Sequence, residues 1–355
     1  GLRTFVYESE SPALAFPILA GTYEIARRGD LAVFYHKGHE FNIDRMLDAM
    51  EAARAKYERD FGPLTWRDLR IVEFPRVATL AESHRTTIAF SEGAGFLSCD
   101  DAEHVDSVFF AVAHEVAHQW FGNLVVPGRS RGAAVLLEGL AEYSAGALIE
   151  EDLGVDAAVR FRRFEEATYL RERSADRESP LALLDESSPS DAIVAYQKAG
   201  LVFHMLENEI GRDRLNAALR EYTARFGDRP NHPTIHDLIA IVRENGADES
   251  LDGFFDQWFE RVVIPNGALV DANVRREGSD FVVEFTVTNA GGGRVPVMVE
   301  AVGAGSRAAA MRIHLEEGQM THGTIRAAFK PEQLVLDRTC DVIDSDRTDN
   351  SLPLN

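Results

Sequence analysis

The 355-residue sequence is poor in cysteine and lacks long apolar runs. Its two cysteines, Cys99 and Cys340, are too few for a disulfide framework, and we expect both thiols to be unpaired. No apolar run approaches the roughly 18 residues that a membrane-spanning helix needs. The sequence therefore encodes neither a disulfide-stapled domain nor a membrane span.

Positive charge is also scarce. Lysine and arginine number 37 against 58 acidic residues, which leaves a net charge of −21 at pH 7. A field of this sign repels phosphate backbones and anionic membrane surfaces, so nucleic acid is excluded as a partner. Composition is otherwise that of a folded protein, with 45% hydrophobic and 27% charged residues, and the length predicts two or three domains.

The first part of the chain combines strand and helix patterns. Residues 1–30, interrupted by Pro12, Pro17 and Gly21, read as an irregular N-terminal segment. Residues 31–263 form a mixed α and β region in which apolar positions recur first at strand and then at helix spacing. The expected elements are strands at residues 31–35, 69–74 and 86–90, an amphipathic helix at 44–61, and mainly helical structure from 106 to 261.

The period of the pattern changes at Ile264-Pro265-Asn266-Gly267 from about 3.6 to 2, which marks a domain boundary. Beyond it, residues 268–347 alternate apolar and polar positions in six short segments and predict a small antiparallel β-sandwich. Residues 348–355 are left as a tail. The whole chain is thus predicted to be of the α+β class.

An apolar helix between residues 108 and 122 contains two imidazoles and a carboxylate. His114 and His118 are one helical turn apart on the same face, so their ring nitrogens can share one metal ion. Glu115 projects about 100° away, which suits a base acting on a water molecule better than a direct ligand. An accidental pair on a solvated helix is the alternative, but the apolar neighbours would bury these groups without partners at a cost of several kcal/mol.

The next helix supplies a third ligand. A catalytic zinc ion needs three protein ligands and a water, and Glu138 lies in an otherwise apolar stretch from residue 133 to 151. Glu142 follows one turn later and could hydrogen-bond a ligating imidazole, or it could be an exposed helix acid. The predicted cofactor is therefore one Zn²⁺ held by His114, His118 and Glu138.

Two segments resemble the gluzincin aminopeptidases related to aminopeptidase N. His114–Val125 is similar to the zinc-binding helix of that family, and Leu137–Tyr143 is similar to its Asn-Glu-Gly-Phe-Ala helix. The family usually separates the second histidine and the glutamate by eighteen residues, whereas this chain has nineteen. We assign the extra residue to the loop at 127–132. The resemblance implies a thermolysin-like zinc peptidase domain.

The resemblance also implies two residues that act on the substrate. The family's Gly-Ala-Met-Glu-Asn strand binds the substrate's free amino group, and its counterpart here is Ala89–Gly93, with Glu92 as the acid. The family's Tyr-Glu-Lys-Gly element corresponds to Tyr196-Gln197-Lys198-Ala199, in which Tyr196 would stabilise the oxyanion. The alternatives are a solvated loop acid for Glu92 and a core-packing role for Tyr196.

These assignments predict a zinc-dependent metallopeptidase, with Glu115 as general base and peptides as substrates. An aminopeptidase that removes N-terminal residues is favoured; a zinc endopeptidase and a non-catalytic peptide-binding or sensory module are the alternatives. Two family parts, the N-terminal β domain and the C-terminal helical domain, have no counterpart in this sequence. The pattern is also similar to peptidase domains joined to bacterial transporter membrane segments. Two locations stay open for this soluble domain: the cytoplasm, or the extracytoplasmic side of a membrane-attached parent.

Overall fold

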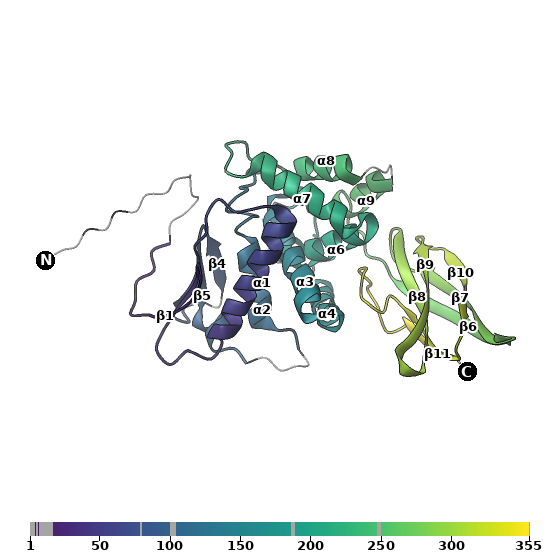
Figure 1. Ribbon diagram of the computed structural model, residues 1–355. Helices are drawn as coiled ribbons and strands as arrows, with labels where there is room; N and C mark the ends of the chain where they lie inside the picture. Colours follow the sequence, from purple (N-terminus) through teal and green to yellow (C-terminus); the bar gives the residue numbers. More distant parts are fainter. Residues whose placement is uncertain are drawn as a thin grey trace.

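A computed structural model of the chain describes residues 17–78, 80–99, 104–185, 189–246 and 250–354, together with Thr4 and Val6. A mixed sheet comes first along the chain, a helical region follows, and two antiparallel sheets lie at the C-terminal side (Figure 1). This arrangement confirms the predicted α+β class. Both cysteines are unpaired, as predicted, with Cys99 exposed and Cys340 buried.

The first sheet has five strands in the order β1-β2-β3-β5-β4. Its central strands β2 (Leu31–Tyr35), β3 (Leu69–Phe74) and β5 (Thr87–Ser91) are parallel. The edge strands β1 (Glu24–Arg28) and β4 (Ala81–His84) are antiparallel to their neighbours. Because the carboxyl ends of parallel strands meet at one edge of a sheet, the segments that follow β2, β3 and β5 lie close together.

The helical region is built around α2 (Ser107–Ala117), which packs between α1 (Ile43–Phe61) and α3 (Leu140–Leu153). Helix α2 begins at Asp106, whose side chain accepts a hydrogen bond of 2.9 Å from the backbone of Phe109. Its apolar residues are buried except for the half-buried Phe110 and Ala111, which line a cleft, and this explains why the helix lies in the core. Among the described residues, no helix has both the length and the apolar character needed to cross a bilayer.

Six further helices complete this region. They are α4 (Val155–Glu172), α5 (Pro189–Ile193), α6 (Ala199–Ile210), α7 (Arg212–Phe226), α8 (Ile235–Gly246) and α9 (Ser250–Phe259). Helices α3, α4 and α6 lie between the first sheet and the C-terminal strands in Figure 1.

The C-terminal strands form a three-stranded sheet, β10-β7-β6, and a four-stranded sheet, β12-β11-β8-β9. All pairings are antiparallel. The alternating valines of β8 are buried, as the period of 2 predicts, whereas β7 buries the adjacent Val282 and Val283. The strands are β6 (Gly267–Glu277), β7 (Asp280–Asn289), β8 (Val295–Gly303), β9 (Arg307–Leu315), β10 (Met320–Ala327), β11 (Pro331–Leu336) and β12 (Ser351–Pro353).

The structure differs from the sequence prediction at both ends of the chain. Strand β1 lies in the 1–30 segment that reads as irregular, and it pairs with β2 along its whole length. Its exposed and half-buried residues carry three charges in five positions, so the apolar alternation that signals a strand is absent. Strand β12 lies in the predicted 348–355 tail, where Ser351–Pro353 pair with β11.

A buried ion-pair network joins the C-terminal segment to the helical region. Arg347 donates to Glu166 of α4 at 2.9 Å and to Asp337 at 3.1 Å. The backbone of Asp344 donates to the same Glu166 carboxylate at 2.8 Å. Burial lowers the pKa of Arg347, but Glu166 and Asp337 outweigh this effect and raise it above its ordinary value, so the arginine stays charged. These bonds fix the C-terminal sheets against α4.

Candidate active site

His114, His118 and Glu138 converge on one point. His114 lies in the last turn of α2, His118 follows its last residue, and Glu138 lies in a helical turn that leads into α3. The two Nε2 atoms are 3.0 Å apart. Glu138 Oε2 lies 3.4 Å from His114 Nε2 and 3.1 Å from His118 Nε2. The structure thus brings together the three predicted zinc ligands.

The dimensions of this triangle fit a zinc ion. Bonds of about 2.0–2.1 Å at tetrahedral angles place neighbouring ligand atoms about 3.3–3.4 Å apart. The observed separations of 3.0 to 3.4 Å are close to that value. Glu138 Oε2 is buried and faces only the two imidazole nitrogens, a costly arrangement that a cation would relieve. Two imidazoles and one carboxylate are also the donor set of known catalytic zinc sites.

A hydrogen bond orients the ring of His118, and a buried carboxylate faces the ring of His114. Nδ1 of His118 donates to the carbonyl of Phe121 at 2.9 Å, which leaves the lone pair of the neutral ring on Nε2. Nδ1 of His114 faces Glu142 Oε1 at 3.6 Å. Glu142 is only 3% exposed, so the alternative of an exposed helix acid is wrong. Burial, and then the charge of Glu165, raise the pKa of Glu142 well above its ordinary value.

Three of the predicted site residues each lie in a π-helical turn. Such turns carry one residue more than an α-helical turn and occur frequently at functional sites. The sequence patterns predict none of them, and the turn at Glu138 offers a second place, besides the 127–132 loop, for the extra residue in the spacing. The three turns are η1 (Glu92–Phe96), η2 (Val135–Gly139) and η4 (Val194–Lys198), which contain Glu92, Glu138 and Tyr196 respectively.

Two glycines allow η2 and η4 to approach each other. A Cβ atom on Gly139 would lie 2.6 Å from the Cβ of Ala199, and one on Gly200 would lie 2.7 Å from the Cβ of Glu142. Any side chain at either position would force the two helices apart. Close packing of α3 on α6 therefore brings Glu138 and Tyr196 to the same site.

Tyr196 lies against the predicted zinc ligands. Its ring stacks on that of His114, with 5.7 Å between centroids and an angle of 7° between planes. Burial and the Glu138 carboxylate raise the pKa of Tyr196 well above 10, so the phenol stays protonated at neutral pH. It is therefore a hydrogen-bond donor beside the predicted metal, although it also packs against the apolar core.

A buried network holds the turn that carries Tyr196. Nζ of Lys198 donates to Glu178 at 2.6 Å, and both side chains are fully buried. Tyr169 of α4 and Arg173, the residue that follows this helix, donate to the same carboxylate at 2.8 and 2.6 Å. Burial raises the pKa of Glu178, but Lys198 outweighs it and holds the pKa below its ordinary value. The charged network thus anchors η4 to α4.

A cleft of about 610 Å³ opens in front of the triangle and is lined by Glu115. Glu115 is 7% exposed, and its Oε2 has no hydrogen-bond partner. Burial raises the pKa of Glu115, while the charges of His114 and His118 lower it. The net upward shift moves this carboxylate toward the neutral range in which a general base works best.

Edge strand β4 forms one wall of the cleft. Gln119, fully buried two residues after α2, donates to Ser83 Oγ at 2.7 Å and to the carbonyl of His84 at 2.9 Å, which fixes the strand against the end of α2. Glu82 lies on this strand, lines the cleft, and is 65% exposed. Glu82 is not among the residues predicted from the sequence. The feature that could have identified it is an acidic residue on the strand that precedes the one with Ala89.

Glu92 lies away from this cleft. Its carboxylate accepts a hydrogen bond of 3.0 Å from the backbone of Arg76 and belongs to a cluster with His36, His39 and Glu73. Only Ala94, two residues later in η1, lines the cleft. The structure therefore does not bring Glu92 together with the other predicted residues.

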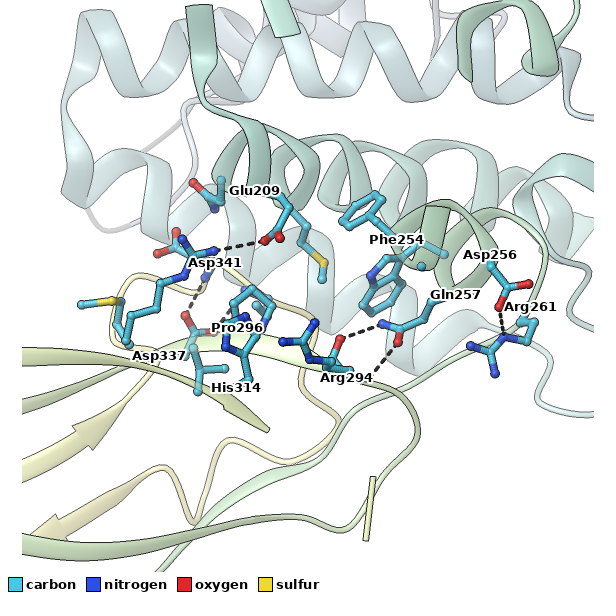
Figure 2. Close-up of a pocket in the computed structure, with 18 residues that line it drawn as sticks. Glu209, Phe254, Asp256, Gln257, Arg261, Arg294, Pro296, His314, Asp337 and Asp341 are labelled. Carbon is cyan, nitrogen blue, oxygen red and sulfur yellow. Dashed lines mark hydrogen bonds and ion pairs between the residues drawn. The ribbon is translucent and has the colours of Figure 1, made fainter. Parts of the chain in front are cut away.

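A second cavity, of about 450 Å³, lies between helices α6 and α9 and strands β8 and β9 (Figure 2). Its arginines are paired: Arg312 lies 3.1 Å from Glu209, and Arg261 lies 3.2 Å from Asp256. Charge in this cavity is therefore largely balanced. It differs from the cleft beside His114, His118 and Glu138, where a carboxylate oxygen of Glu115 has no hydrogen-bond partner.

Comparison with known proteins identifies the family. Residues 43–258, more than half of the chain, match the peptidase family M1 domain, and this stretch contains every predicted site residue. The chain belongs to peptidase family M1. The structure of this M1 chain is similar to the crystal structure of Legionella pneumophila aminopeptidase A in complex with aspartic acid, with a TM-score of 0.65. The likeness covers 88% of this chain and 36% of that one at 18% identity, and it confirms the predicted catalytic fold.

Two of three similar curated relatives of this M1 chain are aminopeptidases by name, and the third is an ectoenzyme. Aminopeptidase M1-B of Oryza sativa subsp. japonica is 28% identical over 270 residues, or 71% of this chain and 30% of the relative. Leucine aminopeptidase 2 of Yarrowia lipolytica is 26% identical over 61% of this chain and 34% of its own length. The thyrotropin-releasing hormone-degrading ectoenzyme of Mus musculus is 25% identical over 45% of this chain and 16% of its own length. The chain thus spans about a third or less of these relatives.

Zinc binding should release a proton at neutral pH. Burial lowers the pKa of His118 in the metal-free protein, but Glu138 outweighs burial and raises it to about 9. Zinc requires the neutral ring, so binding at pH 7 should displace about one proton, and apparent affinity should rise with pH until about 9. Calorimetric titration of chelator-stripped protein in two buffers of different ionisation enthalpy measures this release. Equal heats in both buffers at pH 7 would contradict the prediction.

Substitution Lys198→Met should destabilise the fold by about 3 kcal/mol, because it leaves the fully buried Glu178 short of one cation. Urea unfolding monitored by circular dichroism measures the change. The matched control is Lys330→Met, at an exposed lysine, which should change stability by less than about 0.5 kcal/mol. Equal effects of the two substitutions would show that the network contributes nothing.

Proposed function

We propose that this chain is the catalytic domain of a zinc aminopeptidase. The observation that carries the proposal is the triangle of His114, His118 and Glu138 atoms at 3.0 to 3.4 Å, open to a cleft that Glu115 and Tyr196 also line. Membership of peptidase family M1 supports hydrolysis of peptide bonds. Relatives named as aminopeptidases support removal of N-terminal residues.

His114, His118 and Glu138 would hold the zinc ion, which supplies Lewis-acid activation of a water molecule and of the scissile carbonyl when bound. Glu115 takes the proton from the attacking water and returns it to the leaving amine. The protonated phenol of Tyr196 donates a hydrogen bond to the carbonyl oxygen as negative charge develops there. Glu142 orients the ring of His114 through Nδ1.

For amine recognition, we propose Glu82 in place of Glu92. Binding of a substrate's free α-ammonium needs a carboxylate that faces the cleft. Glu82 meets this condition, because it lines the cleft on edge strand β4, while the carboxylate of Glu92 accepts from the backbone of Arg76. The acid on β4 would restrict cleavage to the first peptide bond by pairing with the amino terminus.

Substitution Glu115→Gln should leave zinc content unchanged and lower kcat by about 10² to 10⁴-fold, because it removes a positioned proton carrier. Peptide hydrolysis and metal content, measured on the same preparation, test this outcome. Full zinc occupancy with unchanged turnover would eliminate Glu115 as the base. Absence of turnover in the unsubstituted protein across a broad peptide library would favour the non-catalytic module.

Substitution Glu82→Gln should raise KM for amino-acid anilides roughly threefold to tenfold, since it removes a partly exposed charge partner of the amine. Hydrolysis of N-acetylated anilides should stay negligible in both proteins. The comparison variant is Glu92→Gln, which should raise KM less than Glu82→Gln does, because its carboxylate does not line the cleft. A KM increase confined to Glu92→Gln would restore the sequence-based assignment, and efficient cleavage of acetylated substrates would favour an endopeptidase.

A further inference from the structure

A second cluster of metal-ligating side chains lies at the carboxyl edge of the first sheet. His36 and His39 follow β2, Glu73 lies on β3, and Glu92 follows β5. These three strands are parallel, so their ends meet at one edge. One ligand atom from each of the four residues lies within 4.8 Å of all the others. Of the active-site residues predicted from the sequence, Glu92 alone belongs to this cluster.

Glu73 is the fixed centre of the cluster. Its side chain is fully buried, and its Oε2 accepts a hydrogen bond of 2.6 Å from the backbone of His36. His36 Nδ1 lies 3.5 Å from the same oxygen, and His39 Nδ1 contacts Oε1. Each of the two ring nitrogens thus already faces a carboxylate oxygen of a completely buried acid.

Neighbouring groups hold the other members of the cluster. The ring of Tyr23 stacks on that of His36, with 5.2 Å between centroids and 19° between planes. The hydroxyl of Tyr23 donates to the carbonyl of Glu73 at 3.1 Å. Glu92 is held through its Oε1 by the backbone of Arg76. These contacts constrain three of the four ligand residues before any ion binds.

Charge balance favours a cation here. Within the described part of the chain, neither Glu73 nor Glu92 forms an ion pair with a lysine or arginine. Two carboxylates, one of them fully buried, therefore depend on two histidines alone for compensation. Two imidazoles with two carboxylates suit a divalent transition metal, whose ligand atoms lie about 3.3 to 3.5 Å apart. His36 and His39 are 30% and 24% exposed, so their rings can move the short distance required.

We propose that His36, His39, Glu73 and Glu92 form a second site for a divalent transition metal, such as zinc. The site ties together the ends of β2, β3 and β5 and the first residue of η1. Because Ala94 of the same turn lines the catalytic cleft, the ion would also stabilise one cleft wall. The proposal concerns metal binding alone and stands independently of the proposed peptidase activity.

Metal content separates the two sites. Protein stripped by a chelator, reloaded with Zn²⁺ and desalted should hold two zinc ions per chain by mass spectrometry. The variant His36→Gln/His39→Gln should hold one, and His114→Gln/His118→Gln should also hold one. Combination of all four substitutions should abolish tight binding. One zinc ion in the unsubstituted chain, lost only with His114→Gln/His118→Gln, would overturn the proposal.

Cobalt supplies an independent readout in the protein that lacks the catalytic histidines. Titration of His114→Gln/His118→Gln with Co²⁺ should produce visible absorption bands and a higher melting temperature. Addition of Glu92→Gln, which removes a half-exposed ligand and spares the buried Glu73, should weaken Co²⁺ binding by roughly 100-fold. A matched Glu82→Gln addition should leave Co²⁺ binding unchanged. Absence of bands in a folded His114→Gln/His118→Gln protein would also refute the site.

Discussion

The separation of 3.0 to 3.4 Å among three ligand atoms is the constraint on which the catalytic half of the molecule depends. Burial in a largely apolar interior removes water from two imidazoles and a carboxylate, and Glu138 Oε2 and His114 Nδ1 find no hydrogen-bond partner there, so packing must hold these groups in place. The capped α2 helix supplies the histidines, and the turn before α3 supplies Glu138. Binding energy of a metal ion would then offset the cost of burying these groups.

Packing between helices decides where the catalytic side chains lie. Gly139 and Gly200 let α3 and α6 approach to a distance that no larger side chain permits. The π turns of η2 and η4 then direct Glu138 and Tyr196 to the same point, and the buried Lys198 network holds the second turn. The side chains of this site are therefore positioned by packed helices and not by flexible loops.

The first sheet serves both sites. Edge strand β4, held by Gln119, forms a wall of the cleft. The second cluster, His36, His39, Glu73 and Glu92, lies at the carboxyl ends of β2, β3 and β5. Turn η1 joins them, because it begins at Glu92 and presents Ala94 to the cleft. Glu92 therefore has an explanation in the structure that differs from the amine-binding role its motif implies.

The sequence by itself determined the helix at Ile43–Phe61, the strands at 31–35 and 69–74, the β region after residue 267 and the pairing of His114 with His118. Each depends on periodicity or on spacing within one element, which neighbouring residues specify. Only the tertiary structure decided that Glu82 faces the cleft and that His36, His39, Glu73 and Glu92 meet. Those contacts join separate strands, and their register and order are set by long-range packing that no local pattern records.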